Sequence, residues 1–342
     1  MLTALIVLIF LSILVLVHEF GHFIAAKRFG LFVEEFGIGL PPRIYGKKIG
    51  ETIYSINALP IGGFVKIAGE NGEEDADKKI PSERVFFNLK IWRRIIIIIA
   101  GVTMNFILGW VLISVIFAVG VPQAVFITQV QSNTPAAQAG VQVNDKIVGF
   151  TSVDDLINYI NQNKGKQIDL KVERNGEKLD FKMTPRTNPP PGEGSLGIGM
   201  VQSGQQKESV LKSVWDGLKS AGQMFSIIFV GIFTLIKLAI LGRSPLQNIT
   251  GPVGIVKLTA QFSHLGLIYL TQLLALISVN LAAINIFPFP ALDGGRLLFL
   301  IIEKIKGSPL PKKFESYANA VGMALLLLLI AIITYKDITR LF

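Results

Sequence analysis

The chain contains no cysteine and few charged residues, and each of these features excludes certain classes of protein or of site. Because none of its 342 residues is cysteine, disulfides, thiolate catalysis and cysteine-based zinc sites are excluded. Any metal ion must be held by His, Asp or Glu, and the chain has only 3 histidines. Charged residues make up 17% of the chain and apolar residues 51%, which predicts a membrane protein. Basic and aromatic residues are not interleaved, so the net charge of +9 does not indicate nucleic-acid binding.

Several apolar segments are long enough to cross, or nearly cross, a hydrocarbon core of about 30 Å. Four of them are clear, at residues 2–26, 95–119, 265–290 and 318–335. A fifth, 214–241, carries Trp215, Asp216, Lys219 and Lys237. This segment either crosses the membrane or lies in its interface as an amphipathic helix.

Basic residues at the segment ends indicate the orientation. Lys27 and Arg28 follow the first segment, which predicts a retained span whose carboxyl end faces the cytoplasm. A cleaved leader peptide is the alternative. The second segment is entered through Arg93 and Arg94 and therefore runs outward, so we expect the residues that follow it to lie outside the cytoplasm.

The segments between the spans differ in character. Residues 31–80 combine Gly, Pro and β-branched runs, which predicts β-hairpins, and residues 123–186 contain short strands and one helical piece. We therefore expect four parts: a membrane core at 1–119, an extracytoplasmic module at 120–190, a linker with an interfacial amphipathic helix at 191–260, and a second membrane core at 261–342.

The extracytoplasmic module resembles a PDZ domain. The resemblance rests on the order SNTPAAQAG, VNDKIVGF, DDLINYI and ERNGEKL. PDZ domains bind extended peptides at a sheet edge, which implies capture of a substrate or partner terminus, while a spacer that binds nothing tightly is equally open. The expected fold is an α-helical polytopic membrane protein with four transmembrane helices, a membrane-associated β-hairpin region and one inserted PDZ-like α/β domain.

The segment LVLVHEFGHFIAA carries the main candidate site. It places His18 and His22 four residues apart on one helical face, with Glu19 beside them. Two neutral imidazoles suit zinc, and a neighbouring carboxylate can act as general base on a water. Ionisable residues inside a span cost about 2–3 kcal/mol each, which favours a functional explanation over mere polar pairing between helices.

Asp293 is the candidate third ligand. It follows Pro288 and Pro290, which break the helix, so we expect its carboxylate on non-helical backbone at membrane depth. An ordinary loop at the end of a span is the alternative. If 214–241 lies in the interface, 265–290 runs inward and brings Asp293 to the depth of the histidines. The metal hypothesis therefore predicts four spans.

Taken together, the motifs resemble the site-2 proteases, and among them the bacterial enzymes of regulated intramembrane proteolysis that cleave anti-sigma factors. The resemblance covers most of the chain and rests on HEFGH, FGIGLP, PIGGFVK, GPVGI and NLAAINIFPFPALDGG in that order. It implies that His18, His22 and Asp293 bind Zn2+ and that Glu19 is the catalytic base. The chain has room for one PDZ-like module, whereas the sigma-E type commonly has two.

The same resemblance implies substrate-binding residues. Asn280 and Asn285 match motif asparagines that the family uses around the substrate. Gly37 and Gly39 fall in a membrane-dipping β segment that pairs with an unwound substrate strand. Such pairing makes physical sense because the peptide bond of a helix must be opened before water attacks it.

The expected substrates are single-span membrane proteins, such as anti-sigma factors or signal-peptide remnants. The enzyme is expected in the bacterial inner membrane as a multi-pass protein, with its active site near the cytoplasmic side and its PDZ-like domain outside. Two alternatives from other classes are an intramembrane metal-ion carrier and a non-catalytic PDZ scaffold. Sparse polar residues in the other spans argue against the carrier, and the intact Glu19 argues against the scaffold.

Overall fold

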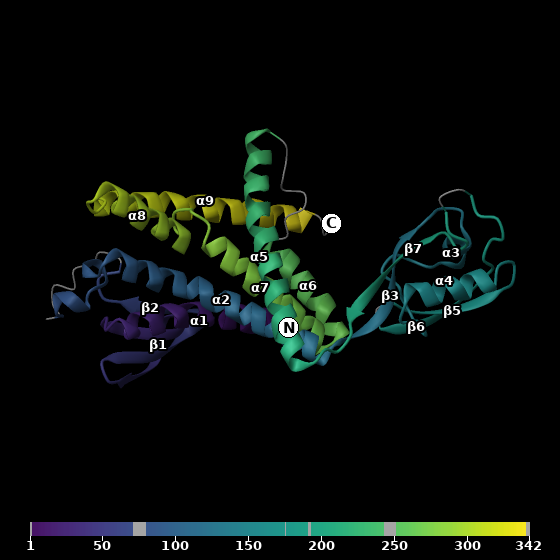
Figure 1. Cartoon of the computed structure of the whole chain (residues 1–342), viewed down its shortest axis with the longest axis horizontal. Coiled ribbons are helices and arrows are strands. Elements are labelled where there is room, and N and C mark those ends of the chain that lie inside the picture. The colour runs from purple at the N-terminus through teal and green to yellow at the C-terminus, as the bar shows by residue number, and fades with distance from the viewer. Residues whose placement is uncertain (1, 71–79, 175, 191–192, 243–250, 340–342) are drawn as a thin grey trace. The chain divides into compact units, whose positions relative to one another are not determined.

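The structure is a computed structural model that describes residues 2–70, 80–174, 176–190, 193–242 and 251–339. The chain divides into two compact units (Figure 1). The larger unit combines Met1–Ser114 with Val214–Phe342, and the smaller unit is Val115–Ser213.

Long apolar helices dominate the larger unit. Within the described residues, five are long and apolar enough to cross a membrane: α1 (Leu2–Arg28), α2 (Ile91–Val119), α5 (Val210–Ile240), α7 (Leu267–Asn285) and α9 (Lys312–Thr339). The expectation of a multi-pass membrane protein is confirmed. The expected count of four is not, because α5 meets the same criterion of length and composition.

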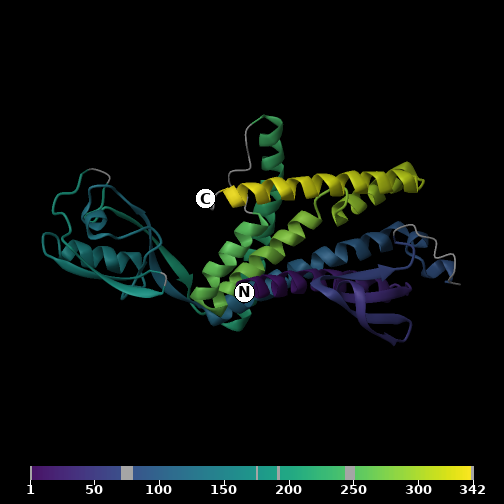
Figure 2. The ribbon, with the colours of Figure 1, turned by 180° about the vertical axis from the view of Figure 1, so that it is seen from behind.

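The direction of α5 differs from that of the other long helices. In both ribbon views, α1, α2 and α9 run along a common direction while α5 runs across it (Figure 2). Two shorter helices, α6 (Pro252–Leu265) and α8 (Asp293–Lys306), flank α7 in the sequence.

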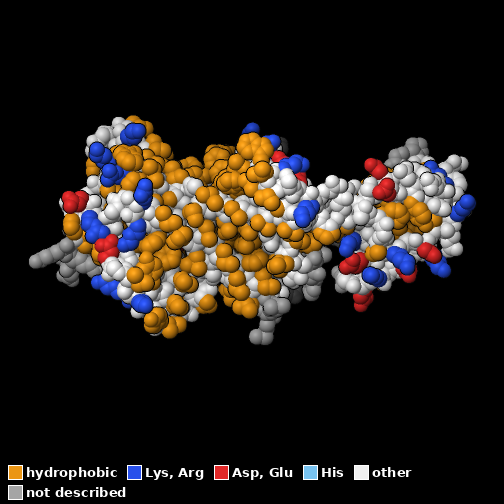
Figure 3. Space-filling model, turned by 60° about the horizontal axis from the view of Figure 1, so that its bottom comes forward, with side chains coloured by type: hydrophobic (Ala, Val, Ile, Leu, Met, Phe, Trp, Pro, Cys, Tyr) orange, Lys and Arg blue, Asp and Glu red, His pale blue; other side chains and the backbone are white. Residues whose placement is uncertain are grey.

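Large apolar side chains face outward on these helices, as they do on a surface covered by lipid. Ile227 of α5 is 72% exposed and Leu327 of α9 is 59% exposed. On the face drawn in Figure 3, hydrophobic side chains cover most of the larger unit, and charged side chains gather toward its margins.

The predicted β-hairpin region is present as β1 (Val33–Ile49) and β2 (Thr52–Ile67). Both strands bend, so that they form four short segments. Residues 33–40 pair on one side with 59–67 and on the other with 53–56, while 43–49 pair with 52–57. Residues 33–40 are therefore an interior strand, and 59–67 form an edge.

A shared core fixes this edge strand beside the helices. It contains Ala26 at the end of α1, Val33 and Ile67 at the two ends of the β region, Ile97 of α2 and Leu300 of α8, all buried. Two short 3-10 turns, Ser82–Arg84 and Phe86–Asn88, lead from the β region to α2. The β region, α1, α2 and α8 thus meet at one end of the unit.

The smaller unit is a five-stranded sheet with two helices. Its strands are β3 (Val121–Val130), β4 (Lys146–Ile147), β5 (Ile168–Arg174), β6 (Glu177–Met183) and β7 (Ile198–Gln205), in the spatial order β6-β5-β4-β3-β7. Its helices are α3 (Pro135–Ala139) and α4 (Val153–Gln162). The predicted strands and the predicted helix are present. The edge strand β7 lies in the segment expected to be a linker, so the sheet extends beyond the expected end at residue 190.

Candidate metal centre

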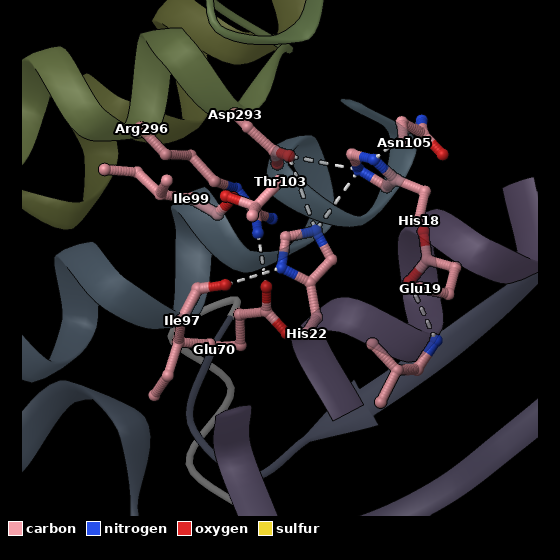
Figure 4. Close-up of polar contacts among 11 residues, drawn as sticks. His18, Glu19, His22, Glu70, Ile97, Ile99, Thr103, Asn105, Asp293 and Arg296 are labelled. Atoms are coloured by element: carbon pink, nitrogen blue, oxygen red, sulfur yellow. Dashed lines mark hydrogen bonds and ion pairs between the residues drawn. The ribbon is translucent and has the colours of Figure 1, made fainter. Parts of the chain in front are cut away.

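His18 and His22 of α1 converge with Asp293, the first residue of α8 (Figure 4). Asp293 Oδ2 lies 3.0 Å from His18 Nε2 and 3.4 Å from His22 Nε2. The two ring nitrogens are 3.2 Å apart, and both histidines are buried. The three predicted metal ligands therefore meet at one point, although they come from distant parts of the sequence.

Glycines bring the start of α8 close to the end of α7. A Cβ at Gly294 would overlap the carbonyl oxygens of Phe287 and Ile286, and a Cβ at Gly295 would overlap that of Phe289. Only glycine permits so close a backbone approach. The segment that breaks the helix after α7 is therefore packed directly under Asp293.

The donor set fits zinc. A tetrahedral ion with bonds of about 2.0–2.1 Å to its ligands holds neighbouring donor atoms about 3.3 Å apart, close to the three separations found here. Asp293 Oδ2 is buried and accepts no hydrogen bond within the described chain. The two imidazole nitrogens face each other beside this carboxylate oxygen. A cation bound by all three atoms stabilises such an arrangement.

Neighbouring groups orient both imidazoles. His22 Nδ1 lies 2.8 Å from the carbonyl oxygen of Ile97 and donates its proton there, which leaves Nε2 free for a metal. His18 Nδ1 lies 3.3 Å from the side-chain amide of Asn105, whose Oδ1 is buried and unbonded within the described residues. Exchanging the two amide atoms lets the Asn105 oxygen accept the His18 Nδ1 proton. Ser278 Oγ donates to the Asn105 backbone oxygen at 2.7 Å and ties α2 to α7.

Glu19 faces the edge strand of the β region. The backbone N–H of Val65 donates to Glu19 Oε2 at 3.2 Å. The strand can lie this close because a Cβ at Gly63 would stand 2.7 Å from the side chain of Leu16 of α1, and one at Gly62 3.3 Å from that of Val15. The candidate general base is thus held between its own helix and the strand that borders the site.

The three candidate metal ligands and Glu19 line a cavity of about 820 Å³. Phe64 and Val65 line it from β2, Asn285 from α7, and Asn319 and Met323 from α9. Glu70 and Arg296 also line it and form an ion pair (Figure 4). The cavity is therefore large enough for an extended peptide segment and has both an acidic and a basic wall.

The predicted substrate residues are distributed unevenly. Asn285 lines the cavity, whereas Asn280 does not line it and donates from Nδ2 to the carbonyl oxygen of Leu276 at 3.0 Å. Gly37 and Gly39 lie on the interior strand. Gly37 pairs with Phe64 on one side and Ser55 on the other. A Cβ at Gly37 would overlap the Phe64 ring, so close packing accounts for this glycine.

Sequence reasoning missed the supporting residues of the site. Asn105 was visible as one of the few polar residues in a span, which was the available signal for it. Glu70, Arg296 and Asn319 carry no comparable signal, because polar residues near the ends of helices and strands are common. Their proximity to the site follows only from the fold.

The sequence of this chain is similar to those of known proteins over nearly its whole length. The family model described as peptidase family M50 matches residues 6–329. The chain is 30% identical to the regulator of sigma-W protease RasP of Bacillus subtilis, over 98% of each chain. It is 31% identical to the zinc metalloprotease RasP of Shouchella clausii, over 97% of each chain. It is 30% identical to the zinc metalloprotease RasP of Bacillus licheniformis, over 96% of this chain and 97% of the relative.

Proposed function

The chain belongs to peptidase family M50 and is a multi-pass intramembrane zinc metalloprotease, and we propose that it hydrolyses peptide bonds within or near the membrane segment of single-span proteins. The observation that carries this proposal is the triangle of His18, His22 and Asp293 donor atoms beside Glu19 in one cavity. A metal carrier would need further polar groups along a path, but in the described part of the chain this is the one group of three or more ligand side chains.

The chemistry divides between the metal and the protein. Zinc, when bound, polarises the scissile carbonyl and lowers the pKa of a coordinated water. Glu19 takes a proton from the attacking water and delivers it to the leaving amine. The Val65 N–H holds one Glu19 oxygen, so the carboxylate stays oriented while the second oxygen handles the proton. Ile97 and Asn105 keep the two imidazoles in the tautomers that present Nε2 to the metal.

The substrate segment lies extended along the edge of β2. Phe64 and Val65 of this edge strand line the cavity, and Asn285 lines it from α7. An added strand exposes the peptide carbonyl that a helix keeps hydrogen-bonded. Gly37 and Gly39 contribute indirectly, since they let the interior strand pack behind this edge.

Four helices, α1, α2, α7 and α9, cross the membrane. Asp293 meets the histidines only if α7 ends at their depth, which requires α7 to run inward like α1. If α5 crossed the membrane, the chain would have to cross back before α7 for α7 to run inward. With 14 residues, α6 is about 21 Å long and too short for that crossing. The crosswise course of α5 supports an interfacial position (Figure 1). The site then lies near the cytoplasmic face of a bacterial inner membrane, and the PDZ-like module lies outside.

The substrates are regulatory single-span proteins of the anti-sigma-factor type. The name of the Bacillus subtilis relative, a regulator of sigma-W, supports this class. The PDZ-like module captures an extended terminus by pairing it with a strand at the edge of its sheet, and α4, which packs near β7, borders that edge.

The test compares wild-type protein with Glu19→Gln in detergent, on a panel of tagged single-span proteins, with zinc content measured in parallel. Glu83→Gln, at an exposed position in the first 3-10 turn, is the matched control. We expect Glu19→Gln to keep zinc and lose cleavage, while Glu83→Gln keeps both. Folded wild-type protein that holds no zinc, or a Glu19→Gln variant that cleaves normally, would overturn the proposal.

A further inference from the structure

We infer that Asn319 of α9 is a positioning residue that fixes the loop carrying Asp293 and thereby completes the metal site. The inference rests on the proposed metal site and adds a helix, α9, that contributes none of the three ligands. Asn319 accepts a hydrogen bond from the Ala291 N–H in the loop at 286–292, and it also lines the cavity of the candidate metal site.

The first observation is the backbone of Ala291. This residue has φ 75°, in the left-handed region that residues other than glycine seldom adopt. Its N–H donates to Asn319 Oδ1 at 3.0 Å. This hydrogen bond joins a side chain of α9 to the backbone of residues 286–292. The side chain of Asn319 therefore stabilises this conformation, in addition to backbone hydrogen bonds such as that from the Leu292 N–H to the Phe289 oxygen at 3.2 Å.

The second observation is the close fit of α9 against the same loop. Gly322 lies three residues after Asn319, on the same helical face, and is buried. A Cβ at Gly322 would stand 2.5 Å from the carbonyl oxygen of Pro290 and 2.8 Å from its Cβ. Asn319 and Gly322 thus hold Ala291 and Pro290 together, one by a hydrogen bond and the other by contact.

Asp293 follows Ala291 by two residues, so the position of the loop sets the position of the ligand. Leu292, which precedes the helix α8, makes no capping bond through its side chain. The start of α8 is held by the backbone hydrogen bond from the Leu292 N–H to the Phe289 oxygen at 3.2 Å, by its close approach to Phe287, and by α9 through Asn319. Displacing the loop moves Asp293 Oδ2 away from His18 and His22, which are held independently on α1.

Asn319 acts as the hydrogen-bond acceptor of the Ala291 N–H, so two variants at position 319 test this role. Asn319→Leu keeps the size of the side chain and removes the acceptor. Asn319→Asp keeps an oxygen where Oδ1 lies and removes the amide donor. If Asn319 acts through the Ala291 N–H, Asn319→Asp preserves the metal site and Asn319→Leu weakens it.

The experiment measures zinc dissociation by chelator competition on the purified full-length chain, with Tyr317→Leu as control. Tyr317 is on the same helix and 72% exposed. We expect Asn319→Leu to raise the zinc dissociation constant about tenfold, the scale seen when groups that orient metal ligands are lost. Asn319→Asp and Tyr317→Leu should stay within about twofold of wild type on the same scale.

Two further readouts separate positioning from general damage. The visible spectrum of the cobalt-substituted protein should change in Asn319→Leu and not in Tyr317→Leu, and kcat should fall with little change in KM. Equal zinc affinity in wild type and Asn319→Leu overturns this inference and leaves the proposed function standing. Equal losses in Asn319→Asp and Asn319→Leu also overturn it, because the acceptor would then be irrelevant. Wild-type protein that holds no zinc overturns both.

Discussion

Gly101 of α2 lies directly against the ring of His22. A Cβ added to Gly101 would overlap His22 Nε2 and stand 2.9 Å from Cε1 of His18. The candidate metal site therefore depends on a residue with no side chain, because α2 supplies the wall behind both imidazoles.

Gly101→Ala is expected to abolish zinc binding and cleavage, since the new methyl group occupies the space of the His22 ligand atom. Helix propensity alone would favour alanine over glycine by about 1 kcal/mol. Gly231→Ala in α5 is the control, because a Cβ there meets nothing within 4 Å. Zinc content by atomic absorption and thermal unfolding in detergent measure the two effects. A Gly101→Ala protein that retains stoichiometric zinc contradicts the close contact.

Asn105 is expected to orient His18 without touching the substrate. Asn105→Leu removes the hydrogen-bond partner of His18 Nδ1 and should weaken zinc binding about 10- to 100-fold. Asn105→Asp keeps an acceptor and should lose much less. Chelator competition measures both. Thr103→Val, which removes a hydroxyl that donates to the Ile99 carbonyl oxygen of its own helix, is the matched control on α2. Equal affinity in Asn105→Leu and wild type would remove Asn105 from the metal site.

The ligand pair on α1 could be predicted from the sequence because its geometry is local. A helix places His18 and His22 on one face whatever surrounds it. Asp293 required an argument about the depth of a distant loop, together with the resemblance to a family. Asn319 and Gly101 could not be predicted, because their roles arise from contacts between helices that periodicity does not encode.

The β region and α5 show the same limit. The Gly, Pro and β-branched runs of residues 31–80 predicted hairpins but not their packing, and Gly37 packs against Phe64 inside the sheet. The composition of α5 suits both a spanning and an interfacial helix, so its course had to come from three-dimensional structure. The bends that make 59–67 an edge strand have no signature in the alternation of residues.

Asp337 near the end of α9 caps the start of α6. Its Oδ2 accepts the backbone N–H groups of Gly251 and Gly254, each at 2.9 Å, and the side chain is buried. Asp337→Ala leaves both donors unpaired and should lower the free energy of unfolding by about 1 kcal/mol, whereas Asp337→Asn keeps an acceptor. Thermal unfolding in detergent tests this, with the exposed Tyr335→Leu as control. Equal stability of Asp337→Ala and wild type would contradict the cap.

The absence of cysteine makes the number of spans directly testable, since any single cysteine is unique in the chain. If α5 lies in the outer interface, Leu241→Cys, at its 60% exposed carboxyl end, reacts with an impermeant maleimide added outside intact cells. Lys178→Cys in the PDZ-like module should react in the same way, and Lys306→Cys at the carboxyl end of α8 only in broken cells. Labelling of Leu241→Cys that requires broken cells would mean that α5 crosses. The inward course of α7, and with it the topology proposed for the metal site, would then be wrong.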